Sequence, residues 1–233
     1  MNSPAIQSRS ARALLNRRRM SAEDRKRQIL RSAIESFAQK GFSGTKTRDI
    51  AAAAGVSEAI LFRHFGTKED LYHAILDIKE TREGMSQRIQ DLEALAARRD
   101  DAALLGQLTA QTLRSFREDP AFHRLLLYAG LEGHLLASLF HERFGLPTGD
   151  FLRKYIALRQ EEGAFCKCDP DTAVMFFFGS VVQYAMSRYL FDAQDESPGD
   201  DAVAAQLVEL VLRGLVNPGH KRTTGKAANA TKV

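Results

Sequence analysis

The sequence has no tryptophan and only two cysteines and six prolines among its 233 residues. Cys166 and Cys168 cannot form a disulfide framework, and no second cysteine pair is present to complete a zinc site. We interpret both as reduced thiols of a cytoplasmic protein. The longest stretch without a charged residue, Thr172–Ser187, is shorter than the roughly 20 apolar residues that cross a bilayer. No apolar signal segment follows the N-terminal arginines, so we expect a cytoplasmic protein without a membrane partner.

Signals for β-structure are also missing. No stretch alternates cleanly between apolar and polar residues, and the hairpin dipeptides Asn-Gly and Asp-Gly do not occur. Helical periodicity runs through most of the chain, which predicts an all-α fold. We interpret four of the prolines, Pro120, Pro147, Pro170 and Pro198, as breaks between helices. Beyond the N-terminal third, we predict helices near residues 101–117, 120–130, 132–144, 148–163, 170–191 and 200–215.

Charge is distributed unevenly along the chain, although the net charge is only +4. Residues 1–20 carry five arginines and residues 217–233 carry four basic residues, and neither segment has an acid. Residues 21–68 have nine basic and five acidic residues, whereas residues 69–216 have 15 basic and 24 acidic. This pattern favours a polyanionic partner at the N-terminal end. The run Arg17–Arg19 is compatible with a minor-groove arm or with a solvated tail.

Residues 47–64 have the spacing of a helix, a tight turn and a second helix. We expect Thr47 to be the N-cap of the first helix and Gly55 to end it in the left-handed conformation. Ser57 is expected to cap the second helix. This pattern is typical of a helix-turn-helix, whose second helix enters the major groove of DNA, and an ordinary helical corner is the alternative.

Capping boxes predict helices on both sides of this motif. Ser21 and Asp24 open the first helix, which we expect to end at Gly41. Thr67–Asp70 open a long helix that we expect to extend to about Leu95.

The stretch from about residue 24 to residue 75 resembles the DNA-binding domain of the TetR family of transcriptional regulators. The resemblance is carried by Arg27–Leu30, Phe37, Gly41–Phe42, Thr45, Asp49–Ala51, Ala54–Ser57, Leu61–Phe65 and Lys68–Leu71. It implies an all-α homodimer with an N-terminal three-helix DNA-binding domain and a C-terminal helical domain for ligand binding and dimerisation. We assign the basic arm to residues 1–20, the helix-turn-helix domain to 21–68 (motif about 46–65), the ligand-binding and dimerisation domain to 69–216, and the basic tail to 217–233.

The resemblance places DNA-binding residues at the start of the motif, along its second helix and at the start of the next helix. They are Lys46, Thr47, Arg48, Ser57, Glu58, Ala59, Ile60, Phe62, Arg63, His64 and Lys68. The first three lie where helix amides and the positive end of the dipole suit phosphate. Lys68 stands where the family usually binds phosphate, and Arg63 is placed for phosphate or guanine.

Four positions of the second helix have specific expectations. Glu58 can accept a hydrogen bond from a cytosine amino group, or it can simply place a favourable negative charge at the helix N-terminus. Ile60 can contact a thymine methyl group. Phe62 replaces the tyrosine that the family usually has; it keeps the packing of the ring and loses a hydroxyl that contacts phosphate. His64 is compatible with a DNA contact or with packing against the short helix.

The last two helices are expected to hold the homodimer together. The segment from Val174 to Met186 is apolar on all sides, which a ligand-lined core on one face and a subunit interface on another would explain. The predicted dimer residues are Phe177, Val181, Val203, Leu207, Leu210 and Val211.

These features predict a sequence-specific DNA-binding regulator, interpreted as a repressor that a small, mostly apolar effector releases from a palindromic operator in double-stranded DNA. The alternatives are an activator or a ligand-independent DNA-binding protein. A helical enzyme built around His134 and His141 is the least favoured class, because the sequence has no nucleophile–base spacing, phosphate loop or metal motif. We therefore expect no catalytic residue, no cofactor and no metal.

Overall fold

A computed structural model describes residues 21–83, 85–191 and 199–218, so the predicted arm and most of the predicted tail lie outside the described residues. Helices account for most of the described chain, and its strand-like pairing is limited to an isolated bridge between Phe165 and Val216. The predicted all-α fold is confirmed. None of the helices in the described ranges is long and apolar enough to cross a membrane.

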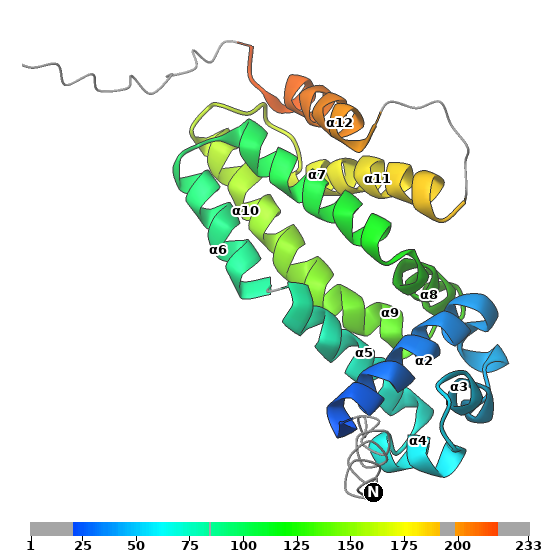
Figure 1. Ribbon diagram of the computed structural model, residues 1–233. Coiled ribbons are helices and arrows are strands. Elements are labelled where there is room, and N and C mark those ends of the chain that lie inside the picture. The colour runs from blue at the N-terminus through cyan, green and yellow to red at the C-terminus, as the bar shows by residue number, and fades with distance from the viewer. Residues whose placement is uncertain (1–20, 84, 192–198, 219–233) are drawn as a thin grey trace, which may run out of the picture.

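The N-terminal end of the structure is formed by α2 (Ala22–Gly44), α3 (Thr47–Ala53) and α4 (Glu58–His64), as Figure 1 shows. The amide of Asp24 donates to Ser21 Oγ at 3.0 Å, so the expected cap of α2 is present. Gly41 has a φ of 68°, which interrupts helical geometry at the residue where the sequence predicts the helix to end.

The second predicted capping box opens α5 (Lys68–Glu83). The Asp70 amide donates to Thr67 Oγ1 at 3.0 Å, and the Thr67 amide donates to the Asp70 carboxylate at 2.9 Å. The long helix predicted from Lys68 to about Leu95 is described in two parts, α5 and α6 (Met85–Ala97), which together reach just past Leu95. Position 84, between the two parts, lies outside the described residues.

The middle of the chain forms α7 (Asp101–Glu118), α8 (Pro120–Leu131), α9 (Leu135–Phe140), a π-helical turn (His141–Gly145) and α10 (Leu146–Glu161). The predicted break at Pro147 is wrong, because helical backbone continues from α9 through the π-helical turn into α10. In this turn the Leu146 amide donates to the His141 carbonyl, five residues back. Pro147 thereby falls in the first turn of α10, where a missing N–H and a fixed φ are tolerated.

The chain ends with α11 (Pro170–Tyr189) and α12 (Asp200–Leu215), at the far end of the molecule from α3 and α4 (Figure 1). Two hydrophobic clusters hold the helices together. One joins α2–α5 to α8 and α9, and the other joins α6, α7, α10, α11 and α12. Because α8 packs directly against α2, the N-terminal helices share a core with part of the helical body.

Candidate nucleic-acid interface

The turn between α3 and α4 fixes the angle between the two helices. Gly55 has a φ of 63°, which glycine adopts without strain, as predicted. The Val56 amide donates to the Ala51 carbonyl at 2.9 Å. Ser57 Oγ accepts from the Ile60 amide at 3.3 Å, so Ser57 caps α4 as predicted. Leu61 is fully buried, and one face of α4 therefore packs on the core while the other faces solvent.

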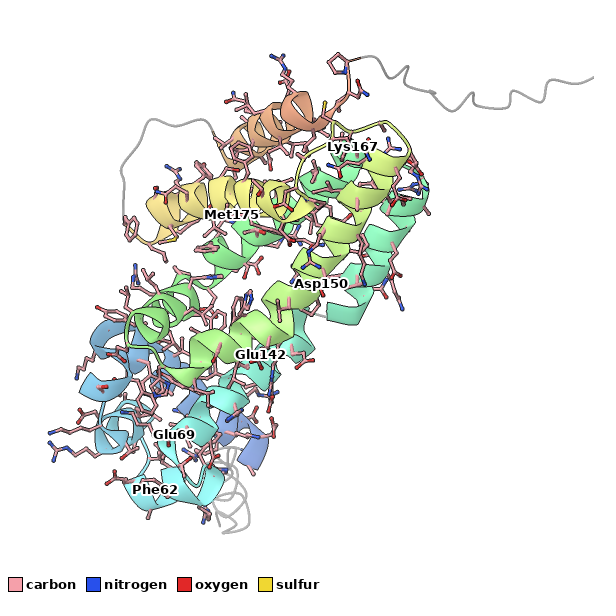
Figure 2. All side chains as sticks on the ribbon, turned by 180° about the vertical axis from the view of Figure 1, so that it is seen from behind. Phe62, Glu69, Glu142, Asp150, Lys167 and Met175 are labelled. Carbon is pink, nitrogen blue, oxygen red and sulfur yellow. The ribbon has the colours of Figure 1, made fainter. Side chains whose placement is uncertain are left out.

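The outer face of α4 is accessible along its length. Glu58, Ala59 and Arg63 are exposed, whereas Ile60 and His64 are half-buried. Phe62 leaves 44% of its surface exposed, so much of its ring is accessible from solvent. Figure 2 shows Phe62 at the end of the molecule remote from Lys167. An aromatic ring at this position can contact sugar or base surfaces without a hydroxyl.

Thr47 connects the two helices of the motif. The predicted role of Thr47 as N-cap is wrong: Lys46 is the N-cap, without a side-chain bond, and Thr47 is the first residue of α3. Its hydroxyl instead donates to the Glu58 carboxylate at 2.5 Å, across the turn. The carboxylate of Glu58 is therefore positioned by α3, in addition to lying at the N-terminus of α4.

The start of α3 carries exposed positive charge. Lys46 and Arg48 are both exposed. Arg48 Nε lies 3.7 Å from the Asp49 carboxylate, and Lys40 Nζ lies 4.0 Å from it. Such surface ion pairs contribute little to the stability of the fold. Arg48 and Lys40 can therefore leave Asp49 and bind a phosphate oxygen instead.

Lys68 is half-buried, and its ammonium turns toward α2. Its ammonium donates to the Phe42 carbonyl and lies 3.9 Å from the centroid of the Phe42 ring. Desolvation by burial lowers the pKa of Lys68 below its ordinary value. This placement follows from the kink at Gly41, which brings Phe42 over the start of α5.

Sequence reasoning missed the contact of α8 with the same kink. The Glu132 carboxylate accepts from the Phe42 amide at 3.1 Å. The positive φ of Gly41 favours glycine, and a Cβ there would also displace the Glu132 carboxylate. His134 lies against the Phe42 ring at 3.8 Å between centroids. Nothing local in the sequence identifies this contact, since Phe42 and Glu132 are 90 residues apart.

A cavity of about 450 Å³, hereafter the body pocket, lies between α6–α11 and the π-helical turn. Most of its lining is apolar or aromatic. The lining residues are Arg88, Gln111, Thr112, Ser115, Phe116, His123, Leu126, Leu127, Ala137, Phe140, Phe144, Gly145, Thr148, Phe178, Val182, Met186 and Leu190. Its size and composition are those of a small-molecule site.

His123 is the buried titratable group of the body pocket. Its Nε2 lies 3.0 Å from Ser115 Oγ, and its ring stacks on Phe116 at 3.7 Å. Desolvation, followed by the positive charge of Lys79, lowers the pKa of His123 to about 4. The imidazole is therefore neutral at pH 7.

We expect the folded protein to lose stability on acidification through His123. Its folded pKa of about 4 lies below the ordinary histidine value of 6.5, so the unfolded chain takes up the proton first. Its contribution is complete above pH 6.5 and declines as the pH falls toward 4, by up to about 3 kcal/mol. Urea unfolding at pH 7 and pH 4.5 measures the loss. His123→Gln should show a smaller loss, and a pH dependence equal to wild type would contradict the assignment.

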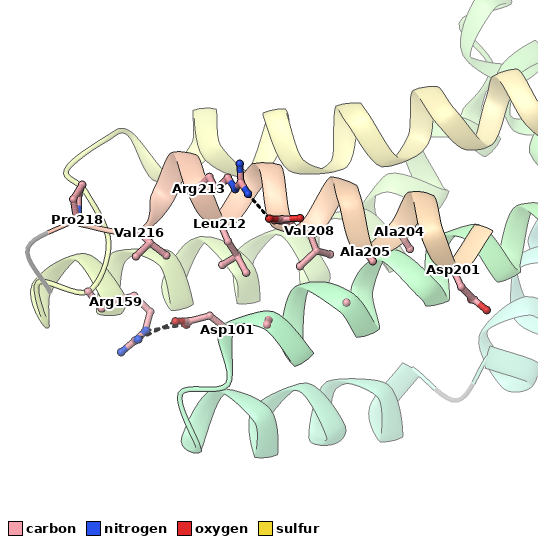
Figure 3. Close-up of a pocket in the computed structure, with 14 residues that line it drawn as sticks. Asp101, Arg159, Asp201, Ala204, Ala205, Val208, Leu212, Arg213, Val216 and Pro218 are labelled. Carbon is pink, nitrogen blue, oxygen red and sulfur yellow. Dashed lines mark hydrogen bonds and ion pairs between the residues drawn. The ribbon is translucent and has the colours of Figure 1, made fainter. Parts of the chain in front are cut away.

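A larger cavity of about 890 Å³ lies between α7 and α12 (Figure 3). Exposed residues of α12, among them Asp201, Ala205 and Arg213, form one wall, so this cavity is an open groove. Asp101 and Arg159 on its floor are bonded to each other at 2.9 Å. The body pocket has the more apolar and aromatic lining and adjoins α8, which packs on α2.

Residues 29–75 match the family described as bacterial regulatory proteins, tetR family. The chain is 49% identical over 49 residues to the HTH-type transcriptional repressor Rv3405c of Mycobacterium tuberculosis, a stretch that covers 21% of this chain and 26% of that repressor. It is 31% identical over 172 residues to the HTH-type transcriptional regulator RutR of Escherichia coli K12, covering 69% of this chain and 74% of RutR. Both relatives are named as regulators of transcription.

A solved structure shows the same fold. The transcriptional regulator FadR from Bacillus subtilis, in complex with stearoyl-CoA, superimposes with a TM-score of 0.60 at 19% identity. The superposition covers 80% of this chain and 97% of that one. The similarity therefore extends from the helix-turn-helix into the helical body.

Proposed function

This chain belongs to the TetR family of DNA-binding transcriptional regulators, and from that premise we propose that it is a cytoplasmic repressor. In this proposal a homodimer binds a palindromic operator and leaves it when a small, mostly apolar ligand enters the body pocket. The observation that carries the proposal is the combination of an exposed outer face on α4 with an apolar cavity in the body. Two-fold symmetry doubles the few base pairs that one short helix can read.

The exposed side chains divide by the DNA groups they would contact. Lys46, Arg48 and Arg63 would bind phosphates, or in the case of Arg63 a guanine. Glu58, Ala59, Ile60 and Phe62 would face base edges, Ser57 and Thr47 would orient the motif, and His64 would lie at its rim. Lys68 would act by holding α5 against Phe42, not by binding phosphate directly.

Arg63→Ala tests the proposed DNA contact. Because Arg63 is exposed, its removal should change the free energy of unfolding by no more than about 0.5 kcal/mol. DNA affinity should fall at least tenfold, measured by gel shift on operator DNA selected from a random pool. Arg213→Ala, an exposed arginine of α12, is the matched control and should bind normally. A loss at one base position would identify a base contact, a uniform loss would identify a phosphate contact, and unchanged binding would contradict the site.

The predicted dimer face needs correction. Phe177, Val181 and Val211 are buried in the subunit's own core, so they cannot form an outer surface; Val203 and Leu207 are half-buried. The apolar side chains that α11 and α12 present to solvent are Met175, Phe176 and Leu210, each more than 60% exposed. Met175 is labelled on α11 in Figure 2. We place the dimer interface on these three residues.

Leu210→Glu should dissociate the dimer while each subunit stays folded. A charge at a buried interface position without a partner is strongly unfavourable, whereas Leu210 contributes little to its own subunit because 63% of it is exposed. Light scattering after gel filtration measures the mass. Ala205→Glu adds the same charge on the groove side of α12 and should remain dimeric. A tight dimer of the Leu210 variant would exclude this face.

Ligand release is proposed to act through contacts that reach α2 and α5. The body pocket is lined by α8, which packs on α2, and by the π-helical turn, where Arg143 pairs with Asp77 of α5 at 2.6 Å. The stearoyl chain of the stearoyl-CoA bound by FadR supports a ligand with an apolar part. By linkage, the ligand lowers the affinity for DNA by the same factor by which DNA lowers the affinity for the ligand. This corresponds to a coupling free energy of about 1–3 kcal/mol.

A further inference from the structure

We propose that the body pocket selects the free carboxylate of an apolar acid, with the carboxylate held by Arg88 and Gln111. This inference rests on the proposed function, because it assigns a chemical class to the effector of the same pocket. Two observations support the inference: the hydrogen-bonding groups of the pocket wall and the positive charge of that wall.

Most polar side chains of the wall are hydrogen-bonded within the protein. Thr112 Oγ1 donates to the Leu108 carbonyl at 2.9 Å, and Thr148 Oγ1 donates to the Phe144 carbonyl at 3.0 Å. Ser115 is bonded to His123. These groups are committed to their own helices and to the imidazole, so they are not the main anchors for a ligand.

Arg88 and Gln111 present hydrogen-bond donors. Arg88 Nε donates to Gln111 Oε1 at 3.1 Å, and this bond turns the amide so that its NH₂ group points away from the guanidinium. A guanidinium has five N–H donors and no acceptor, so both side chains can offer N–H groups to a third partner. Arg88 has other interactions in the structure, and an incoming carboxylate would join or replace them. A carboxylate accepts such donors in a short, charge-assisted geometry.

The charge of the pocket wall agrees with an anionic ligand. Among the described lining residues Arg88 is the charged side chain, and no aspartate or glutamate is present. His123 contributes a neutral imidazole. The same wall includes Phe116, Phe140, Phe144 and Phe178, which offer apolar surface for the rest of the molecule. A volume of about 450 Å³ suits an acid of modest size.

Calorimetric titration with matched acids and alcohols tests the charge preference. The probes are decanoate and decanol, and 2-naphthoate and 2-naphthylmethanol, so that both flexible and flat molecules are represented; decanoyl-CoA tests the thioester. At least one acid should bind the wild-type protein ten times or more tighter than its alcohol. Equal binding of each acid and its alcohol, binding of the thioester without the acid, or binding of neither acid would overturn the proposal.

Variants assign the preference to the two residues. Arg88→Gln should remove the tenfold advantage of the acid and leave alcohol binding unchanged. Gln111→Glu keeps the side-chain size and places a negative charge beside Arg88, so it should weaken the acid at least tenfold even if Arg88→Gln fails to fold. Arg98→Gln, an exposed arginine just beyond α6, should bind as wild type. If the Gln111 variant retains the acid preference, the assignment is wrong.

The same titrations, repeated with operator DNA, separate this inference from the proposed function. Relief of DNA binding by acids and alcohols alike would leave the repressor proposal in place and overturn the carboxylate preference. A clear acid preference without any effect on DNA affinity would support the inference and contradict ligand-controlled repression.

Discussion

DNA affinity is expected to fall by about 10³–10⁵-fold when monovalent salt is raised from 50 to 200 mM, if the dimer neutralises roughly 6–10 phosphates. Each protomer exposes Lys46, Arg48 and Arg63 at the proposed interface, which gives six cations in a dimer. At about 0.9 counterions released per phosphate, these six alone predict a slope of about −5 in a plot of log affinity against log salt. Fluorescence anisotropy over a salt series measures this slope.

Two variants assign the slope to parts of the chain. Arg63→Ala removes two contacts per dimer and should make the slope shallower by about 2 if Arg63 binds phosphate. Deletion of residues 1–20, which contain five arginines, should make it shallower still if that segment touches DNA. An unchanged slope after deletion would show that the arm is a bystander. A slope near zero in the full-length protein would contradict the proposed electrostatic interface altogether.

Asp119→Asn is expected to destabilise the fold by about 3–5 kcal/mol, because it leaves a buried ammonium without its partner. Lys79 Nζ lies 2.6 Å from Asp119 Oδ2, with side-chain exposures of 9% and 26% respectively. The same ammonium lies 4.4 Å from the centroid of the Phe122 ring. Asparagine can still accept from the Phe122 amide and cap α8 as Asp119 does, so the substitution mainly removes the charge.

The double variant Lys79→Met/Asp119→Asn should recover most of the lost stability, because it replaces the pair with uncharged groups of similar size. Asp150→Asn is the surface control: Asp150 pairs with Arg153 at 2.5 Å but is 46% exposed, so its loss should cost less than about 1 kcal/mol. Urea unfolding at one protein concentration measures the free energy of unfolding of the wild-type protein and the three variants. Equal effects of Asp119→Asn and Asp150→Asn would contradict the buried character of the Lys79–Asp119 pair.

The local features of the DNA-binding end were predictable because their causes lie within a few residues. The Ser57 cap and the Thr67–Asp70 box are hydrogen bonds that span three residues, and Gly55 is the residue type that a left-handed turn requires. An all-α fold follows from helical periodicity, which needs no knowledge of neighbouring segments. The charge of the exposed α3 and α4 residues is likewise set by composition.

Contacts between distant segments were decided only by the tertiary structure. Every face of α11 is apolar, so periodicity could not show that Phe177 and Val181 turn inward while Met175 and Phe176 stay exposed. The position of Lys68 over Phe42, and of Glu132 on the Phe42 amide, depends on how α5 and α8 pack against α2. The sequence by itself determined most of the helices, the caps at Ser21, Ser57 and Thr67 and the resemblance of the motif, because these are local. The body pocket, the outer face of the dimer and the buried Lys79–Asp119 pair required the packed chain, because burial is a property of neighbours that the sequence does not place side by side.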